Sequence, residues 1–362
     1  MMNVLVLTNM YPSREYPYYG IFVKNINKII NECGYTIETE CVVKANSKFQ
    51  KTLAYIRYFL VSIVKINFKK YAFVYIHYPA FSAIPLLFLM RRNVKLIVNI
   101  HGNDLVPETL KDVFFRKFTD LAVKKANNVV LPSEYFKHIF MERYPSFEKN
   151  KIFISPSGGV DKKIFYPTPN SIDKNHLKLS RKYKYIGFAS RIEKGKGWDL
   201  YLDMVEHLVH KLPNYRFVLV GSGSEEAALE AQLHSRKLEK YVIKFGYLDQ
   251  CELSEIFRLL DVFCFPSLRK SESLGLVGLE AMACGAIVVS SSGTGPESYI
   301  TDGETGFIIS PLTTESLAKK VFEISQISET EKTKIRSSAY KKVKCYSTEV
   351  VKKNFASFLS QI

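Results

Sequence analysis

Short apolar runs alternate with longer helical patterns along nearly the whole chain. In the first half, apolar runs at 4–8, 73–77, 96–100 and 129–132 predict buried strands, and the apolar spacing over 21–31 predicts a helix. In the second half, runs at 185–189, 217–220, 242–245, 262–265 and 287–290 predict further strands. Continuous apolar strands that alternate with helices are typical of parallel sheets covered on both faces. The pattern therefore predicts an α/β protein with two doubly wound, Rossmann-like parallel-sheet domains.

A polar stretch at 167–184 (PTPNSIDKNHLKLSRKYK) separates the two series of strands and shows no clear periodicity. We therefore predict an N-terminal domain over 1–166, a linker over 167–184 and a C-terminal domain over 185–345. Ligands of open parallel sheets bind outside the carboxyl ends of the strands. Two such domains that face each other would form a central cleft.

The composition excludes several classes of protein. With 47% hydrophobic and 24% charged residues, the chain of 362 residues is neither disordered nor collagen-like nor a coiled coil. The longest apolar stretch, 78–90, contains two prolines and is shorter than the roughly 20 residues of a membrane-spanning helix. The N-terminus (MMNVLVLTNM) lacks the basic region of a signal peptide, and six scattered cysteines without metal-binding spacing indicate reduced thiols. We therefore expect a cytoplasmic protein.

The charge is unusual and unevenly distributed. The chain carries 51 Lys and Arg against 35 Asp and Glu, a net of +16. Residues 1–165 hold 24 bases and 12 acids (24 − 12 = +12), whereas residues 166–362 hold 27 and 23 (27 − 23 = +4). No acid occurs between Glu40 and Asp104. Such an excess favours an anionic partner, which could be nucleic acid, a membrane surface or a phosphorylated small molecule.

The acid-free stretch contains a helical pattern over 51–70. Five apolar side chains fall on one face and four polar ones on the other: Leu53, Ile56, Leu60, Ile63 and Val64 against Lys51, Ser62, Lys65 and Lys69. One interpretation is a helix on an anionic membrane, with Lys51, Lys65 and Lys69 as contacts. The alternative is a surface helix whose apolar stripe packs on the sheet while its lysines are solvated. The missing acids favour the membrane, specifically the inner face of the cytoplasmic membrane.

Two segments of the second half carry chemistry. In ASRIEKGKGWD, Arg191 and Lys196 follow a predicted strand with glycines beside them, as a diphosphate-binding loop requires. In SESLGLVGLEAMACG, Glu272 and Glu280 lie eight positions apart with Gly275 between them, just before a helical pattern. The start of that helix offers free N–H groups to an anion. VLVGSGSEE lacks the third glycine and the following acid of a dinucleotide fingerprint and does not indicate NAD.

Together these motifs resemble those of GT-B glycosyltransferases, and the chain is similar to the retaining family 4, the glycosyltransferase group-1 type. The family's two glutamates separated by seven residues match Glu272 and Glu280, and its Arg-x4-Lys-Gly pattern matches 191–197. Its GxG, its GxPE-type turn and its DGxTG tail match 221–223, 295–297 and 302–306. In the N-terminal half, NIHGNDL and SGGVD match its HGxD and NGVD patterns. The resemblance also implies that a last helix, 346–362, crosses back to the first domain.

The resemblance implies a set of contacts with the donor. Arg191 and Lys196 would neutralise its diphosphate, while Gly20 would let the first loop of the N-terminal domain approach the same group. Backbone N–H groups of the segment formed by Gly275, Leu276 and Val277 would add further phosphate and sugar contacts.

The remaining roles concern the sugar, the ribose and the base. Glu272 would contact the donor sugar and Glu280 the ribose hydroxyls, while Tyr247 and Leu248 would touch the base. His101 would lie under the reacting carbon and, with Glu272, act in catalysis. The alternative for His101 is a buried structural histidine at the end of a strand.

These expectations describe an enzyme that transfers a sugar from a UDP- or GDP-sugar to a membrane-borne, lipid-linked acceptor in bacterial surface polysaccharide or glycan biosynthesis. The chain contains no Asp-x-Asp motif, so we expect a metal-independent reaction without a cofactor. A GT-B epimerase or hydrolase of nucleotide sugars is the first alternative. A nucleic-acid-binding protein is the second; no nucleic-acid-binding motif supports it, and we expect no nucleic-acid partner.

Overall fold

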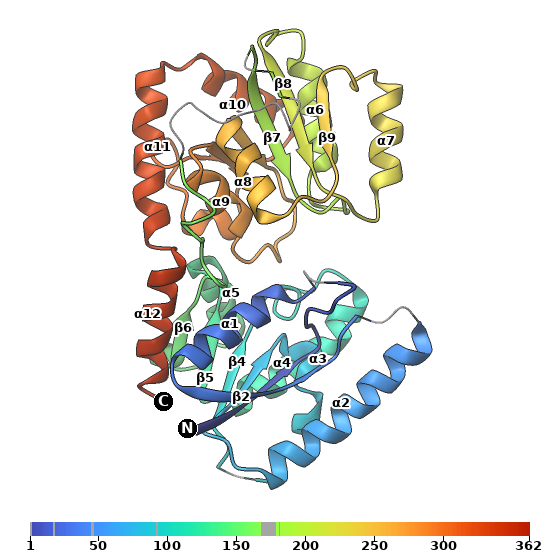
Figure 1. The fold of residues 1–362 in the computed structure, drawn as a ribbon, viewed down its shortest axis with the longest axis vertical. Coiled ribbons are helices and arrows are strands. Elements are labelled where there is room, and N and C mark those ends of the chain that lie inside the picture. The colour runs from blue at the N-terminus through green and yellow to red at the C-terminus, as the bar shows by residue number, and fades with distance from the viewer. Residues whose placement is uncertain (1, 17–18, 45–46, 92, 168–178, 181) are drawn as a thin grey trace. The chain divides into compact units, whose positions relative to one another are not determined.

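The structure is a computed structural model that describes residues 2–16, 19–44, 47–91, 93–167, 179–180 and 182–362. The chain forms two compact units, Met1–Gly158 with Val351–Ile362, and Gly159–Val350 (Figure 1). The first boundary therefore lies at Gly158 rather than at 166, because Val160 and Phe165 are buried in the core of the second unit. Most of the predicted linker, 167–184, lies outside the described residues.

The first unit is built on a six-stranded parallel sheet in the order β2-β1-β3-β4-β5-β6. Its strands are β1 (Met2–Thr8), β2 (Tyr35–Cys41), β3 (Val74–His77), β4 (Leu96–Asn99), β5 (Asn128–Leu131) and β6 (Ile152–Ile154). Its helices are α1 (Ile21–Glu32), α2 (Lys48–Phe68), α3 (Pro79–Ser82), η1 (Ile84–Phe88), α4 (Leu110–Lys125), α5 (Glu134–Arg143), η2 (Lys149–Lys151) and most of α12 (Thr348–Leu359). Apolar clusters cover both faces of the sheet: α2 to α5 pack on one, and α1 and α12 on the other.

The second unit has a parallel sheet of six strands in the order β12-β11-β10-β7-β8-β9. Its strands are β7 (Lys184–Ala189), β8 (Tyr215–Val220), β9 (Val242–Phe245), β10 (Leu260–Phe265), β11 (Ile287–Ser291) and β12 (Phe307–Ile309). Its helices are α6 (Trp198–Leu208), α7 (Glu226–Ser235), α8 (Gln250–Leu259), α9 (Leu276–Ala283), η3 (Gly295–Ser298), α10 (Thr314–Gln326) and α11 (Glu329–Lys344). Again an apolar cluster lies on each face of the sheet.

The predicted α/β class with two doubly wound parallel sheets is confirmed. The sequence pattern missed β2, β6 and β12. β2 lies at the edge of its sheet and carries Glu38 and Glu40, so it has no continuous apolar run, and β6 and β12 contain only three residues each.

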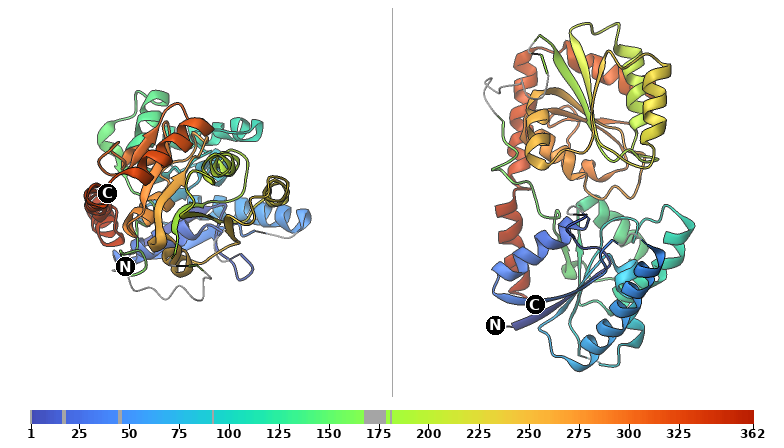
Figure 2. Two further views of the ribbon diagram at one scale, coloured as in Figure 1. Left: turned by 90° about the horizontal axis from the view of Figure 1, so that it is seen from above. Right: turned by 45° about the vertical axis from the view of Figure 1, so that its right-hand side comes forward.

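The long helix α2 buries its polar face and leaves its apolar stripe outside, so the alternative in which the stripe packs on the sheet is wrong. Tyr58, Ser62 and Ile66 are buried against the unit. The predicted apolar stripe points outward: the exposed fractions of its side chains are 49% for Leu53, 50% for Ile56, 61% for Leu60 and 54% for Val64. Figures 1 and 2 show α2 on the outside of the first unit. No helix in the described parts of the chain has the length and apolar character needed to cross a bilayer.

Lys65 does not lie on an outward lysine face, which corrects its assignment as a membrane contact. Its ammonium lies 2.6 Å from a carboxylate oxygen of Glu38 and also pairs with Glu40, both on β2. Lys69 lies 3.1 Å from Glu38. Because β2 brings two carboxylates to this side of α2, the lysines neutralise them, and the apolar residues are left on the outer side. Of the three predicted contacts, Lys51 forms no ion pair with the described residues.

Candidate functional site

The predicted donor residues of the second unit gather at the carboxyl ends of β7, β8, β9 and β10. The strand order reverses between β7 and β10, the position at which doubly wound sheets bind ligands. A cavity of about 340 Å³ lies there. It is lined by Ala189, Ser190, Arg191, Lys196, Val220, Gly221, Ser222, Gly246, Tyr247, Leu248, Leu253, Phe265, Glu272 and Val277. One cavity therefore contains six of the predicted site residues: Arg191, Lys196, Tyr247, Leu248, Glu272 and Val277.

The loop after β7 carries the two cations of the cavity. Gly197 has φ +79° and caps α6, and a Cβ at this position would lie 2.0 Å from the carbonyl oxygen of Pro266. Only glycine fits there, so the Lys-Gly pair of the motif places Lys196 against the β10 side of the cavity. Arg191 is 65% exposed, and its guanidinium lies 2.7 Å from Glu193, so it can turn toward a ligand without breaking a buried contact.

Lys196 and Glu272 form the polar centre of the cavity. Their side chains are 12% and 15% exposed, and Nζ lies 2.6 Å from Oε2 of Glu272. Ser267 donates a hydrogen bond of 3.3 Å to the same oxygen. An ammonium has three donors, so Lys196 can hold Glu272 and a phosphate oxygen at the same time.

The GxG after β8 has a structural reason. A Cβ on Gly221 would lie 1.9 Å from the carbonyl oxygen of Ser190, and one on Gly223 would lie 2.3 Å from that of Ile192. These glycines therefore let the loop after β8 pack directly on the loop that carries Arg191. They shape the wall of the cavity. Packing alone therefore accounts for the GxG motif, without dinucleotide binding.

Gly275 begins α9 in the left-handed region at φ +72°. A Cβ there would meet the ring of Phe265 and the ring of Pro296 at 2.9 Å. The GxPE-type turn supports the same loop, because the N–H of Gly295 donates to the carbonyl of Glu272 at 2.7 Å. No side chain of the described residues caps α9, and its first N–H groups are those of Leu276 and Val277. Of these helix-start residues, Val277 lines the cavity.

Glu280 lies one turn further along α9 and is not among the residues that line the cavity. It is 7% exposed, and burial raises its pKa to about 8. At neutral pH the carboxyl group is therefore mostly protonated. A ligand that brings hydroxyl groups to this carboxyl would favour its ionised form.

Tyr247 and Leu248 follow β9 and form the apolar wall of the cavity with Leu253. Tyr247 is 54% exposed. Arg269, which the sequence analysis did not select, supports the loop after β7 through hydrogen bonds to the carbonyl of Lys194 at 2.8 and 3.0 Å.

Gly20 and His101 belong to the first unit. Gly20 has φ +78° before α1, and a Cβ there would lie 2.8 to 2.9 Å from backbone atoms of Met10 and Tyr11. The loop after β1 therefore needs glycine at this position for its own packing. The helix that follows has no side-chain cap among the described residues.

His101 pairs with a second histidine that the sequence analysis missed. Its Nε2 lies 3.0 Å from Nδ1 of His77, and the two rings stack with centroids 5.2 Å apart. Packing against His77 and Phe22 removes water from the ring, and the pKa of His101 falls to about 3. The backbone N–H groups of His101 and Gly102 donate to the carboxylate of Asp104, which fixes the HGxD turn. His77 ends the strand beside the one that precedes His101, so the sequence pattern could have predicted the pair.

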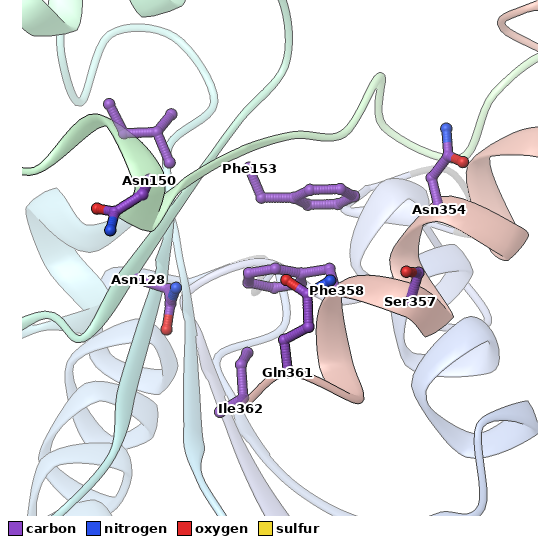
Figure 3. A pocket seen from close by; sticks show the side chains of 9 residues that line it. Asn128, Asn150, Phe153, Asn354, Ser357, Phe358, Gln361 and Ile362 are labelled. Atoms are coloured by element: carbon purple, nitrogen blue, oxygen red, sulfur yellow. The ribbon is translucent and has the colours of Figure 1, made fainter.

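Figure 3 shows another cavity of the first unit, where α12 lies beside β5 and β6. It has a volume of about 380 Å³ and is lined by amides and by the stacked rings of Phe153 and Phe358. None of its lining side chains is charged. Its lining therefore offers no cationic side chain to a diphosphate.

Comparisons with known proteins show what the chain is similar to. Residues 170–342 match the family model for glycosyl transferases group 1. A D-inositol 3-phosphate glycosyltransferase of Kribbella flavida is 27% identical over 236 residues, which cover 63% of this chain and 54% of that protein. The chain spans between about a third and about half of the length of the curated relatives it matches.

Two solved structures are similar over the whole chain. Anabaena HepE in complex with UDP and glucose has a TM-score of 0.78 and 18% identity, with 100% of both chains covered. Sucrose-phosphate synthase from Thermosynechococcus elongatus has a TM-score of 0.80 and 16% identity, with 100% of this chain and 99% of that chain covered. The fold is therefore of the GT-B type, as the sequence predicted.

Proposed function

We propose that this protein is a glycosyltransferase that uses a nucleoside diphosphate sugar as donor. The observation that carries the proposal is the convergence of Arg191, Lys196 and Glu272 on one cavity at the switch point of the second sheet. The match of residues 170–342 to the group 1 model supports the same activity. HepE, with the same fold, is described in complex with UDP and glucose.

In the proposed reaction the nucleoside diphosphate leaves from C1 of the sugar. The bond between C1 and the β-phosphate oxygen breaks, and an acceptor oxygen forms the new bond to C1 on the same face. The proton of the acceptor hydroxyl passes to the β-phosphate. Charge grows on the diphosphate as it departs, so Arg191 and Lys196 stabilise the transition state more than the ground state. This is a retaining reaction in which these two cations hold the diphosphate without a metal.

The other residues hold the donor. Glu272 accepts hydrogen bonds from sugar hydroxyls, while Glu280 accepts them from the ribose. Tyr247 and Leu248 contact the base. The N–H groups of the Gly275–Val277 segment approach the phosphates. His101 is neutral near pH 7, so its ring and backbone would stabilise the oxocarbenium-like sugar through partial charges and not as a general acid.

A panel of nucleotides tests the donor class. We expect UDP or GDP to raise the Tm of the protein, because a ligand at about 100 times its Kd adds roughly 2.7 kcal/mol to the free energy of unfolding. That corresponds to a shift of roughly 5–10 °C for a unit of this size. UMP or GMP should shift the Tm less, since they lack the second phosphate for Arg191 and Lys196. A panel without any shift at millimolar nucleotide would contradict the proposal.

A GT-B epimerase or hydrolase would use the same cavity. It differs in needing no acceptor, so it would consume the nucleotide sugar alone at a rate comparable to turnover with acceptor present. Accumulation of free nucleoside diphosphate from purified protein and donor only, measured by chromatography, distinguishes the two.

The acceptor in this proposal is borne on a membrane. Support comes from the outer stripe, defined here as Phe49, Leu53, Ile56, Leu60 and Val64, which runs along α2 with exposed fractions between 49% and 73%. A contiguous apolar patch of this kind is uncommon on a soluble surface. Exposed bases on the same helix, Lys48 and Arg57, complement an anionic bilayer.

Sedimentation with phosphatidylglycerol vesicles tests this association. Replacing Ile56 and Leu60 with aspartate should lower the bound fraction at least fivefold, because each apolar side chain contributes on the order of 1–2 kcal/mol when buried. Lys48→Glu with Arg57→Glu and added salt should both weaken binding. Phe322→Asp, at an exposed apolar position of α10, is the matched control. Binding that survives the aspartate pair would exclude the outer stripe as the contact.

A further inference from the structure

The first unit contains an apolar groove that the donor chemistry does not use. It is lined by Lys51, Tyr55 and Phe59 of α2, Phe81 of α3, Ile84 of η1, and Lys111 and Phe115 of α4, and has a volume of about 270 Å³. We call this set the aromatic groove. Its volume lies below the range of roughly 300–1,000 Å³ that encloses a whole drug-sized ligand. It can therefore hold part of an elongated molecule.

Aromatic rings form the walls of the groove. Phe81 and Phe115 stack with centroids 4.2 Å apart, and Tyr55 and Phe59 face each other at 5.8 Å on the α2 side. All four side chains are only partly buried in the folded unit. Covering them with a hydrocarbon chain would be favourable at about 25 cal/mol per Å² of apolar surface.

Two ammonium groups flank these walls. Lys111 lies 5.2 Å from the centre of the Phe81 ring, and Lys51 belongs to the first turn of α2. Within the described part of the chain, neither lysine has a carboxylate at ion-pair distance. Two lysines beside an apolar channel complement a ligand with an anionic head and a hydrocarbon tail, for which a phosphate ester is the simplest chemistry.

The aromatic groove reaches the carboxyl edge of the first sheet. Tyr55 lies beside Asn9, which directly follows β1, and Phe81 lies in the short helix after β3. The strand order reverses between β1 and β3, so this is the switch point of the first sheet. Tyr78, in the same connection, stacks on His101 with ring centroids 6.4 Å apart. A molecule in the groove would therefore extend toward the His101 end of this sheet.

The outer stripe lies along the same helix as one wall of the groove. On the other wall, α4 begins with Leu110, Val113 and Phe114, which are 90%, 50% and 58% exposed. Exposed apolar residues thus flank the groove on both sides. Because these apolar residues continue the walls of the groove, they favour a ligand that enters from a lipid bilayer and not one that is dissolved in water.

We propose that the aromatic groove binds the phosphate-bearing end of the lipid acceptor. The first carbons of the lipid lie against Phe59, Phe81 and Phe115, and the phosphate lies between Lys51 and Lys111. This inference rests on the proposed function, because it assigns the acceptor of that reaction. It names the acceptor as a lipid phosphate ester and not an uncharged glycolipid.

Binding of farnesyl phosphate, measured below its critical micelle concentration, tests the proposal with the full-length protein. Lys51→Ala with Lys111→Ala should raise the Kd for farnesyl phosphate at least tenfold and leave weak binding of farnesol unchanged. Phe81→Ala should weaken both ligands. The matched control is Lys124→Ala with Lys125→Ala, which removes two exposed lysines from the other end of α4.

The outcomes distinguish a failure of the groove assignment from a failure of the proposed donor class. If UDP or GDP stabilises the protein but farnesyl phosphate does not bind, the aromatic groove is not the acceptor site, although the proposed function stands. If farnesyl phosphate binds and no nucleotide does, the groove assignment holds and the donor proposal fails. If the lysine pair reduces binding to phosphatidylglycerol vesicles but not to farnesyl phosphate, the groove docks bulk phospholipid and the proposal is overturned.

Discussion

Replacing Arg191 and Lys196 together with alanine is expected to lower kcat for sugar transfer by roughly 10³–10⁴-fold. Removing one group that stabilises developing charge typically costs about 10²–10³ in rate, and both groups here act on the same leaving diphosphate, so their effects should not add fully. The measurement is release of nucleoside diphosphate that depends on acceptor, with circular dichroism to verify the fold. Turnover near the wild-type rate would show that the cavity is not the donor site.

The two single variants should differ. Arg191 is largely exposed, so Arg191→Ala removes a ligand contact and little else. Lys196→Ala also leaves Glu272 without its partner at 2.6 Å, and the carboxylate would then repel the diphosphate. We expect Lys196→Ala to raise the KM for the donor more than Arg191→Ala does. Lys194→Ala is the matched control, because this exposed lysine lies in the same loop but does not line the cavity.

The convergence of the proposed donor residues on one cavity could be predicted from sequence because these residues follow strands. In a parallel sheet the carboxyl ends of neighbouring strands meet at one edge. The segments that follow 185–189, 242–245 and 262–265 are therefore expected to lie close together. The structure explains why glycine stands at fixed positions in these segments. Gly197 and Gly275 each occupy a left-handed position in which a Cβ would collide with the β10 side of the cavity.

The orientation of α2 could not be predicted in the same way. Its sequence has two candidate inner faces, one apolar and one containing Tyr58, Ser62 and Lys65. Which face is buried depends on β2, an edge strand that the pattern missed and whose Glu38 and Glu40 require cationic partners. The contacts with this missed strand decide between the two interpretations of α2, because they place its polar face inward and its apolar stripe outward.

The role of Glu280 links the stability of the free protein to nucleotide binding. Its pKa is about 8 in the folded protein, because the carboxyl is buried, against about 4.3 in an unfolded chain. Between these two pKa values the Glu280 carboxyl is ionised in the unfolded chain but still protonated in the folded protein. Folding takes up a proton in this window, so stability falls as the pH rises from about 4.5 to 8 and then levels off.

Glu280→Gln should remove this loss of stability. We expect the variant to match the wild-type Tm near pH 5 and to exceed it at pH 8, where the buried carboxyl costs up to about 4 kcal/mol, or roughly 8–16 °C. Glu304→Gln, at an exposed position of the same unit, should show no such gain. Equal pH profiles for Glu280→Gln and the wild type would contradict the raised pKa.

The same substitution should weaken nucleotide binding even though it stabilises the free protein. Hydrogen bonds from ribose hydroxyls to a carboxylate contribute about 1.5–3 kcal/mol, so the Kd for UDP or GDP should rise roughly 10- to 100-fold. Because these bonds favour the ionised carboxyl, wild-type binding at pH 7 should release close to one proton, and Glu280→Gln should release none. Calorimetry in buffers of different ionisation enthalpy measures that proton directly. A variant that is more stable at pH 8 yet binds nucleotide as tightly as the wild type would place the ribose elsewhere and leave Glu280 as a buried carboxyl without a ligand.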